Sequence, residues 1–95
     1  GTEMMEIQAK DVLRINRKTR FRRVFEEAVV IHEDKNEALV LNETGAAFLE
    51  ACDGEKTFEQ LIQCLESQFE IETETLRRDM SEFASALLSE EIIER

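Results

Sequence analysis

The chain contains no proline, tryptophan or tyrosine, and its 95 residues include three glycines and one histidine. Three scattered glycines cannot form a glycine-rich phosphate loop, and one histidine cannot complete an H-E-x-x-H metal motif. No hydrophobic run approaches the roughly 20 apolar residues that cross a bilayer, and the sequence given shows no apolar signal segment at its start. We therefore expect a cytoplasmic protein that has no cofactor and no membrane partner.

Cysteine is also scarce, and its spacing argues against a metal site. Cys52 and Cys64 lie twelve positions apart, and His32 is distant from both in sequence. Zinc requires four ligands at closer spacings, so we predict no metal centre. Both cysteines fall on the apolar faces of predicted helices, which indicates buried free thiols rather than redox groups. His32 lies beside Glu33 and Asp34 and is interpreted as a surface histidine.

Catalytic patterns are missing as well. No serine or cysteine has a base close to it in sequence, and the many carboxylates lie mainly on outward helix faces, where solvation explains them. We therefore predict that the chain is not an enzyme.

Charge is distributed unevenly along the chain. Residues 1–25 carry seven lysines and arginines against Glu3, Glu6 and Asp11, for a net charge of +4. Residues 26–95 carry five basic and nineteen acidic side chains, for a net charge of −14. So acidic a remainder repels phosphates, which disfavours a nucleic-acid partner unless the basic stretch acts alone.

The length suits a single domain. We expect residues 1–20 to form a partly ordered basic arm, either extended or with a short turn of helix, and residues 21–95 to form the folded domain. Gly1, Thr2 and Glu3 precede Met4 as a cloning remnant would, so we leave them out of the fold argument.

Three strands are predicted in the first half of the domain. They cover Phe21–Phe25, Ala28–His32 and Ala38–Leu41, with a turn at Asp34–Glu37 before the third. A three-stranded sheet has two edges, and an apolar edge strand left open is a template for pairing with another chain. Either the N-terminal arm covers this edge, or it remains free for another chain, including a second copy that would make a homodimer.

Three helices are predicted to follow the strands. Asn42 caps the first helix, which ends at Asp53-Gly54. Thr57 and Gln60 form a capping-box pattern that opens an amphipathic helix of about twelve residues. Thr73 is predicted to cap the third helix. Its apolar stripe comprises Leu76, Met80, Phe83, Ala84 and Leu87, and Ile92-Ile93 follows as a terminal hydrophobic clasp.

Several of these residues also carry a resemblance to a known family. They are Leu41-Asn42, Gly45-Ala46, Leu49, Cys52-Asp53-Gly54, Thr57, Leu61, Leu65, Phe69, Asp79-Met80, Phe83, Leu87 and Ile92-Ile93. The pattern, which covers residues 21–93, resembles PqqD-like proteins, also called RiPP recognition elements. The resemblance implies an α+β, winged helix-turn-helix-like fold, with a three-stranded antiparallel sheet followed by three helices. In this chain Glu90-Glu91 stands where the family usually has a glycine.

The resemblance also implies a peptide-binding site. In this family the leader segment of a ribosomally made precursor peptide adds as a strand to the third strand and lays side chains into the groove beside the third helix. Carried onto this chain, the site comprises Ala38, Leu39, Val40, Leu41, Arg77, Met80, Phe83, Ala84 and Leu87. Met80 and Phe83 would form the floor of an apolar pocket unless they are plain core, and Arg77 or Arg78 would pair with an acidic leader residue.

The expected partners are therefore the leader peptide and an enzyme that acts on it, such as a radical SAM maturase or a leader peptidase. Two alternatives stay open. One is a winged-helix DNA-binding regulator, which would need basic or amide side chains on the exposed face of its third helix. The other is a subunit that docks onto a maturase without gripping a peptide.

Overall fold

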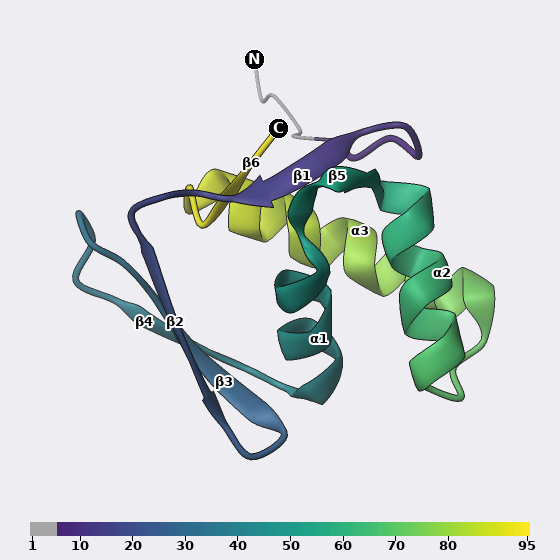
Figure 1. Ribbon diagram of the computed structural model, residues 1–95, viewed down its shortest axis with the longest axis horizontal. Coiled ribbons are helices and arrows are strands. Elements are labelled where there is room, and N and C mark those ends of the chain that lie inside the picture. Colours follow the sequence, from purple (N-terminus) through teal and green to yellow (C-terminus); the bar gives the residue numbers. More distant parts are fainter. Residues whose placement is uncertain (1–5) are drawn as a thin grey trace.

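Two small sheets and three helices make up the molecule (Figure 1). This computed structural model describes residues 6–95, so the suspected cloning remnant and the start of the predicted arm lie outside the described residues. The elements in chain order are β1 (Val12–Ile15), β2 (Thr19–Val24), β3 (Glu27–His32), β4 (Ala38–Leu41), α1 (Glu43–Ala51), β5 (Asp53–Thr57), α2 (Phe58–Gln68), α3 (Thr73–Ser89) and β6 (Ile93–Glu94). The predicted α+β class, with a three-stranded antiparallel sheet and three helices, is confirmed. None of the helices in residues 6–95 is both long enough and apolar enough to cross a membrane.

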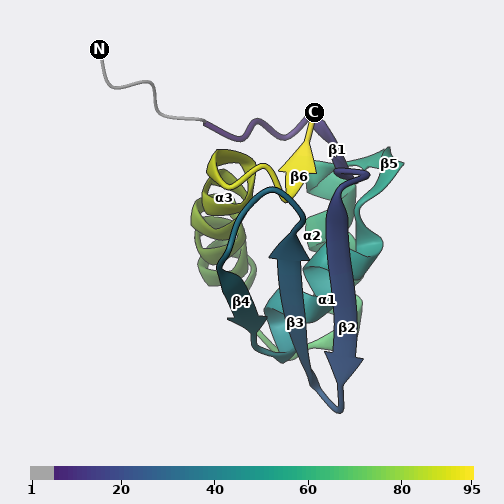
Figure 2. The same ribbon diagram turned by 90° about the vertical axis from the view of Figure 1, so that its left-hand side faces the viewer.

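The larger sheet is ordered β2-β3-β4 and is antiparallel throughout. A two-residue turn at Phe25 and Glu26 joins β2 to β3, and Ala28 and Val30 point toward the helices and are buried. Figure 2 shows this sheet in front of the helices, so one face packs on the core while the opposite face is turned away from it.

The second sheet, ordered β5-β1-β6, was not predicted. Residues 12–15 were expected to belong to an arm or a helix turn, and that expectation is wrong, because they form the central strand β1. Leu13 on this strand is fully buried. The strand is only four residues long and its partners lie about 40 and 80 positions further along, so its own periodicity is too short to reveal it. The division of the chain at residue 21 stays a prediction.

Local capping signals explain where two of the helices begin. Asn42 Oδ1 accepts the backbone N–H of Gly45 at 2.8 Å and so starts α1 as predicted. Thr57 and Gln60 exchange both hydrogen bonds of a capping box at the start of α2. The predicted cap at Thr73 is wrong: Glu72 is the N-cap of α3, and its side chain makes no capping hydrogen bond.

The end of α3 has a left-handed residue. Glu91 has φ 61° and its N–H donates to Leu88 O at 3.0 Å, while the N–H of Ile92 donates to Leu87 O at 2.9 Å. This is the Schellman arrangement, in which glycine usually occupies the left-handed position. The family's glycine position is therefore occupied here by a glutamate in the backbone conformation of a glycine.

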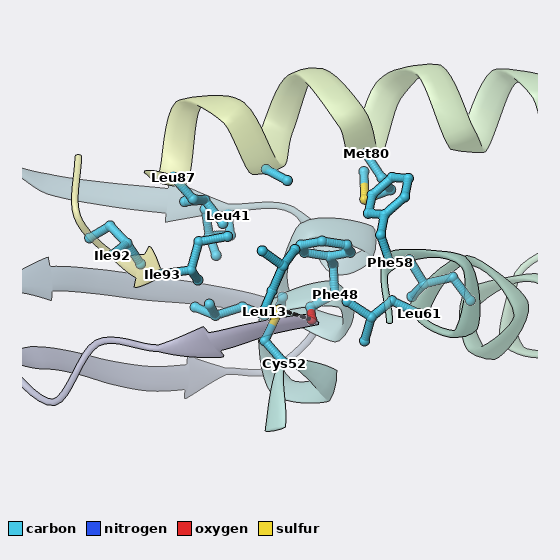
Figure 3. Close-up of a cluster of buried hydrophobic side chains, with 14 of the residues drawn as sticks. Leu13, Leu41, Phe48, Cys52, Phe58, Leu61, Met80, Leu87, Ile92 and Ile93 are labelled. Carbon is cyan, nitrogen blue, oxygen red and sulfur yellow. Dashed lines mark hydrogen bonds between the residues drawn. The ribbon is translucent and has the colours of Figure 1, made fainter. Parts of the chain in front are cut away.

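The core draws on both sheets and all three helices (Figure 3). The predicted clasp is confirmed, since Ile92 and Ile93 are both buried. Cys52 is buried as predicted and its thiol donates to Phe48 O at 3.3 Å. Burial, assisted by the neighbouring Asp53 carboxylate, raises the pKa of the Cys52 thiol to about 12. Cys64 is only half-buried.

His32 is not a surface residue as predicted, because its exposed fraction is 4%. It shares the inward face of β3 with Ala28 and Val30, four and two positions earlier. Its Nδ1 accepts the backbone N–H of Asp34 at 3.1 Å, so the ring provides a hydrogen-bond acceptor for the turn that follows the strand. The neighbouring acidic residues had hidden this alternation.

Candidate functional site

The edge strand β4 pairs with β3 and with no other strand in residues 6–95. The direction of its backbone groups follows from the hairpin before it. The N–H of Glu33 donates to Lys18 O at 2.9 Å, which makes these residues a hydrogen-bonded pair at one end of the β2-β3 ladder. Such pairs alternate along an antiparallel ladder, so the odd-numbered residues of β3 bond to β2 and the even-numbered residues bond to β4.

The same alternation leaves two residues of β4 with free backbone groups. Val30 pairs with Leu39 and Ala28 with Leu41, so Leu39 and Leu41 are the residues that bond to β3. The N–H and C=O groups of Ala38 and Val40 therefore point away from the sheet. This edge offers two donors and two acceptors to an added strand.

A groove of about 550 Å³ lies between β4 and α3. It is lined by Val40, Leu41, Asn42, Thr44, Gly45, Ile71, Leu76, Asp79, Met80, Glu82 and Phe83. The apolar residues come from three places: the end of β4, the loop before α3, and one stripe of α3. An extended segment added to β4 would lie along this groove, because the groove runs beside the free edge.

Phe83 forms part of the groove wall and is held in place from behind. Its ring packs edge-on against Phe48, with ring centroids 5.8 Å apart. A Cβ atom at position 45 would lie 3.1 Å from Phe83 Cζ, so glycine at this position lets the ring approach α1. The small residue in the Gly45-Ala46 pair thus shapes the wall of the groove.

The structure brings together only some of the predicted site residues. Val40, Leu41, Met80 and Phe83 all line the groove. Ala38 and Leu39 lie on the same edge strand, Ala38 exposed and Leu39 half-buried. Ala84 and Leu87 are fully buried and do not line the groove, so they pack α3 against the core.

Arg77 faces away from the groove. Its Nη2 lies 2.6 Å from Glu59 Oε1 on α2, and its Nη1 lies 2.9 Å from Glu74 Oε1. The hydrogen bond to Glu59 raises the pKa of the guanidinium above its ordinary value. Arg77 thus joins α3 to α2, and it is not among the residues that line the groove.

The charge at the groove is negative. Asp79 and Glu82 lie along it, and no lysine, arginine or histidine is among its lining residues. A peptide strand added to β4 would complement the groove if it placed large apolar side chains on the groove floor and a lysine or arginine beside Asp79 or Glu82 at the rim.

Several lining residues were missed by the sequence analysis. Leu76 was placed on the apolar stripe of the third helix but not in the site, and Ile71 was not considered. The available signal was helical spacing, because Leu76, Met80 and Phe83 lie four and three positions apart on one face. Across the described part of the chain, no group of three or more histidine, cysteine, aspartate and glutamate side chains could hold a metal ion.

Comparison with known proteins gives a family and two similar folds. The family model described as coenzyme PQQ synthesis protein D (PqqD) matches residues 27–93. No curated protein matches. The solution NMR structure of the PqqD truncation of Methylobacterium extorquens PqqCD, described as a functional and stand-alone RiPP recognition element, is 22% identical with a TM-score of 0.79. That match covers 99% of this chain and 100% of that chain.

TbiB1, solved in complex with the TbiA(beta) leader peptide, is also similar. It is 20% identical with a TM-score of 0.76, over 85% of this chain and 94% of that chain. At these identities the two structures establish the fold, and the family rests on the match over residues 27–93. That match spans β3, β4, β5 and all three helices, which is more than half of the chain, and the chain therefore belongs to the PqqD family.

Proposed function

We propose that this chain binds the leader segment of a ribosomally synthesised precursor peptide as an added strand on β4 and presents it to a modifying enzyme or leader peptidase. The observation that carries the proposal is the free edge of β4, where Ala38 and Val40 expose backbone groups directly beside an apolar groove. Backbone pairing gives such a complex affinity with little demand on sequence, and alternate side chains entering the groove give it selectivity.

The comparisons support this proposal by analogy. TbiB1 was solved with a leader peptide, and the Methylobacterium extorquens domain is described as a recognition element. Both share the fold of this chain, in which a free strand edge lies beside a groove. The expected binding residues are Ala38, Leu39, Val40, Leu41, Met80 and Phe83, now joined by Ile71 and Leu76.

The leader is expected to be apolar and cationic. Asp79 and Glu82 flank the apolar floor, while Arg77 is held by Glu59 and Glu74. A lysine or arginine of the leader beside Asp79 or Glu82 would gain a charge pair at the rim. This replaces the expectation that Arg77 or Arg78 pairs with an acidic leader residue, because neither arginine is among the residues that line the groove.

The test is an NMR titration of the isotope-labelled chain with the leader peptide of a precursor encoded beside it. Saturable shifts are expected at the amides of Ala38–Leu41 and of residues 76–83. Shifts confined to other segments, or no shifts at all, would contradict the proposal. A sedimentation measurement on the free chain would then show whether β4 pairs with a second copy instead.

Substituting Val40→Pro provides the sharper version of this test. The Val40 N–H points away from β3, so proline removes a donor to the peptide without breaking a hydrogen bond of the sheet. Leader affinity is expected to fall about tenfold, as for one lost hydrogen bond with added steric conflict. Val40→Thr keeps both the N–H and the β-branched shape, and should bind nearly as wild type. Equal binding by both variants would rule out strand addition at this position.

A further inference from the structure

The outer face of the β2-β3-β4 sheet carries a second hollow, separate from the groove. It has a volume of about 710 Å³ and is formed by β2, β3 and the turn between them. Strand register places Arg22 beside Val29 and Val29 beside Val40, in one row across this face. It is the face turned away from the helices in Figure 2.

Large apolar side chains are exposed around this hollow. Phe25 is 91% exposed, Val24 45% and Ile31 40%. A single exposed aliphatic side chain needs no explanation, but several gathered around one depression are typical of a surface that meets another molecule.

Phe25 is not explained by the folding of this chain. It is the first residue of the two-residue turn and has φ 59°, a region in which a bulky side chain is rare. Asparagine, aspartate or glycine is the usual choice there, because each tolerates a left-handed backbone. Phe25 neither favours this backbone nor buries its own ring, so its ring is available to another molecule.

Positive charge surrounds the same hollow. Residues 17–25 carry five basic and no acidic side chains, although the whole chain has a net charge of −10. Arg20 pairs with Glu33 at 2.8 Å and Arg23 with Glu50 at 3.3 Å. Within residues 6–95, no ion pair engages Arg22, so its charge is free for a partner. The complementary surface is apolar at its centre and carries carboxylates at its rim.

We propose that this outer face docks the enzyme that modifies the bound precursor, through an apolar patch of that enzyme rimmed by carboxylates. The inference rests on the proposed function. Side chains alternate along a strand, so a leader paired with β4 would place every second side chain on this face, next to Val40. An enzyme seated here would lie directly beside the bound peptide. Nucleic acids and anionic membranes fit less well, because the acidic remainder of the chain repels them.

The experiment measures binding of the purified modifying enzyme encoded beside this chain, using the wild type and two variants. Phe25→Asn removes the exposed ring and places a residue suited to the left-handed turn, so the fold is retained. Arg22→Glu reverses a charge that takes part in no ion pair of the described chain. Each variant is expected to bind the enzyme at least about tenfold more weakly, as for a residue central to an interface. Arg78→Glu is the matched control, since Arg78 is likewise exposed and is absent from the ion pairs of residues 6–95.

Leader titrations with the same variants separate the two proposals. Unchanged leader binding with weakened enzyme binding supports the docking surface. If both variants bind the enzyme as strongly as the wild type does, the docking surface is wrong, but leader recognition is unaffected. If the wild type does not bind the leader, the proposed function itself is wrong. A short random DNA duplex, anionic vesicles and self-association by sedimentation are measured in parallel. If Phe25→Asn abolished binding to one of these but left enzyme binding unchanged, the outer face would be the binding site for that molecule and not for the enzyme.

Discussion

At the scale of single residues, Glu91 stands where glycine would be favoured. Its φ of 61° lets α3 end with two hydrogen bonds, one from the Glu91 N–H to Leu88 O and one from the Ile92 N–H to Leu87 O. Its carboxylate lies 3.8 Å from Lys35 Nζ, an exposed contact of small energetic value. The backbone conformation therefore matters more than the side chain at this position.

Substituting Glu91→Gly is expected to stabilise the protein. The left-handed conformation disfavours a residue with a Cβ by roughly 1–2 kcal/mol, and part of that gain is offset by the greater freedom of glycine in the unfolded chain. The free energy of unfolding should rise by about 1 kcal/mol, measured by urea denaturation. Glu90→Gly is the control and should destabilise, because Glu90 has φ −87°, a conformation available to any residue. A lower free energy of unfolding for Glu91→Gly than for Glu90→Gly would contradict this account of the helix end.

At the scale of the element, α3 has two faces with separate tasks. One stripe, including Leu76 and Met80, faces β4 across the groove, while Arg77 reaches α2 through Glu59. Asp79 and Glu82 border the groove and supply its negative charge. If the chain binds a leader as proposed, these two charges would contribute to its selectivity, although the sequence analysis had assigned them only to solvent.

The double substitution Asp79→Asn with Glu82→Gln tests this role. Affinity for a leader that carries lysine or arginine should fall about fivefold, because exposed charge pairs contribute roughly 0.2–1 kcal/mol each. The salt dependence of binding should weaken with it. Isothermal titration at two salt concentrations measures both effects.

A matched control has the same change in net charge. Glu66→Gln with Glu70→Gln alters two exposed residues that do not line the groove. This variant should bind the leader as wild type does. A similar loss in both variants would attribute the effect to overall charge rather than to the groove.

At the scale of the whole molecule, β1 ties distant parts of the chain together. It lies between β5, which precedes α2, and β6 near the C-terminal end. Thr19 strengthens the same junction, since its hydroxyl donates to Ile92 O at 2.9 Å. Residues 12–15 thus belong to the core architecture.

Substituting Leu13→Ala tests this role for β1. Leu13 is fully buried, so the lost transfer energy and the cavity left behind should lower the free energy of unfolding by about 2–5 kcal/mol. Val12→Ala on the same strand removes a partly exposed side chain and should lower it by less than about 1 kcal/mol. Thermal and urea unfolding measure the difference. Equal, small effects would mean that the segment is peripheral.

Much of the fold was predictable because it depends on neighbours in sequence. The Asn42 cap, the Thr57–Gln60 capping box and the edge strand at Ala38–Leu41 all follow from residues a few positions apart. Four of the eleven residues that line the groove were also predicted, namely Val40, Leu41, Met80 and Phe83, and the last two share a helical stripe. Their assignment to the groove came from the family resemblance, and the geometry adds Ile71 and Leu76.

The sequence by itself thus determined the helices, the larger sheet and the family, because capping, periodicity and local motifs are short-range properties of the chain. Only the tertiary structure decided the burial of His32, the central position of β1 and the turn of Arg77 toward Glu59. Each of these depends on residues that lie far apart along the chain or on the packing of whole elements. Local periodicity cannot reveal such pairings, because the interactions that stabilise them form only when the elements pack together.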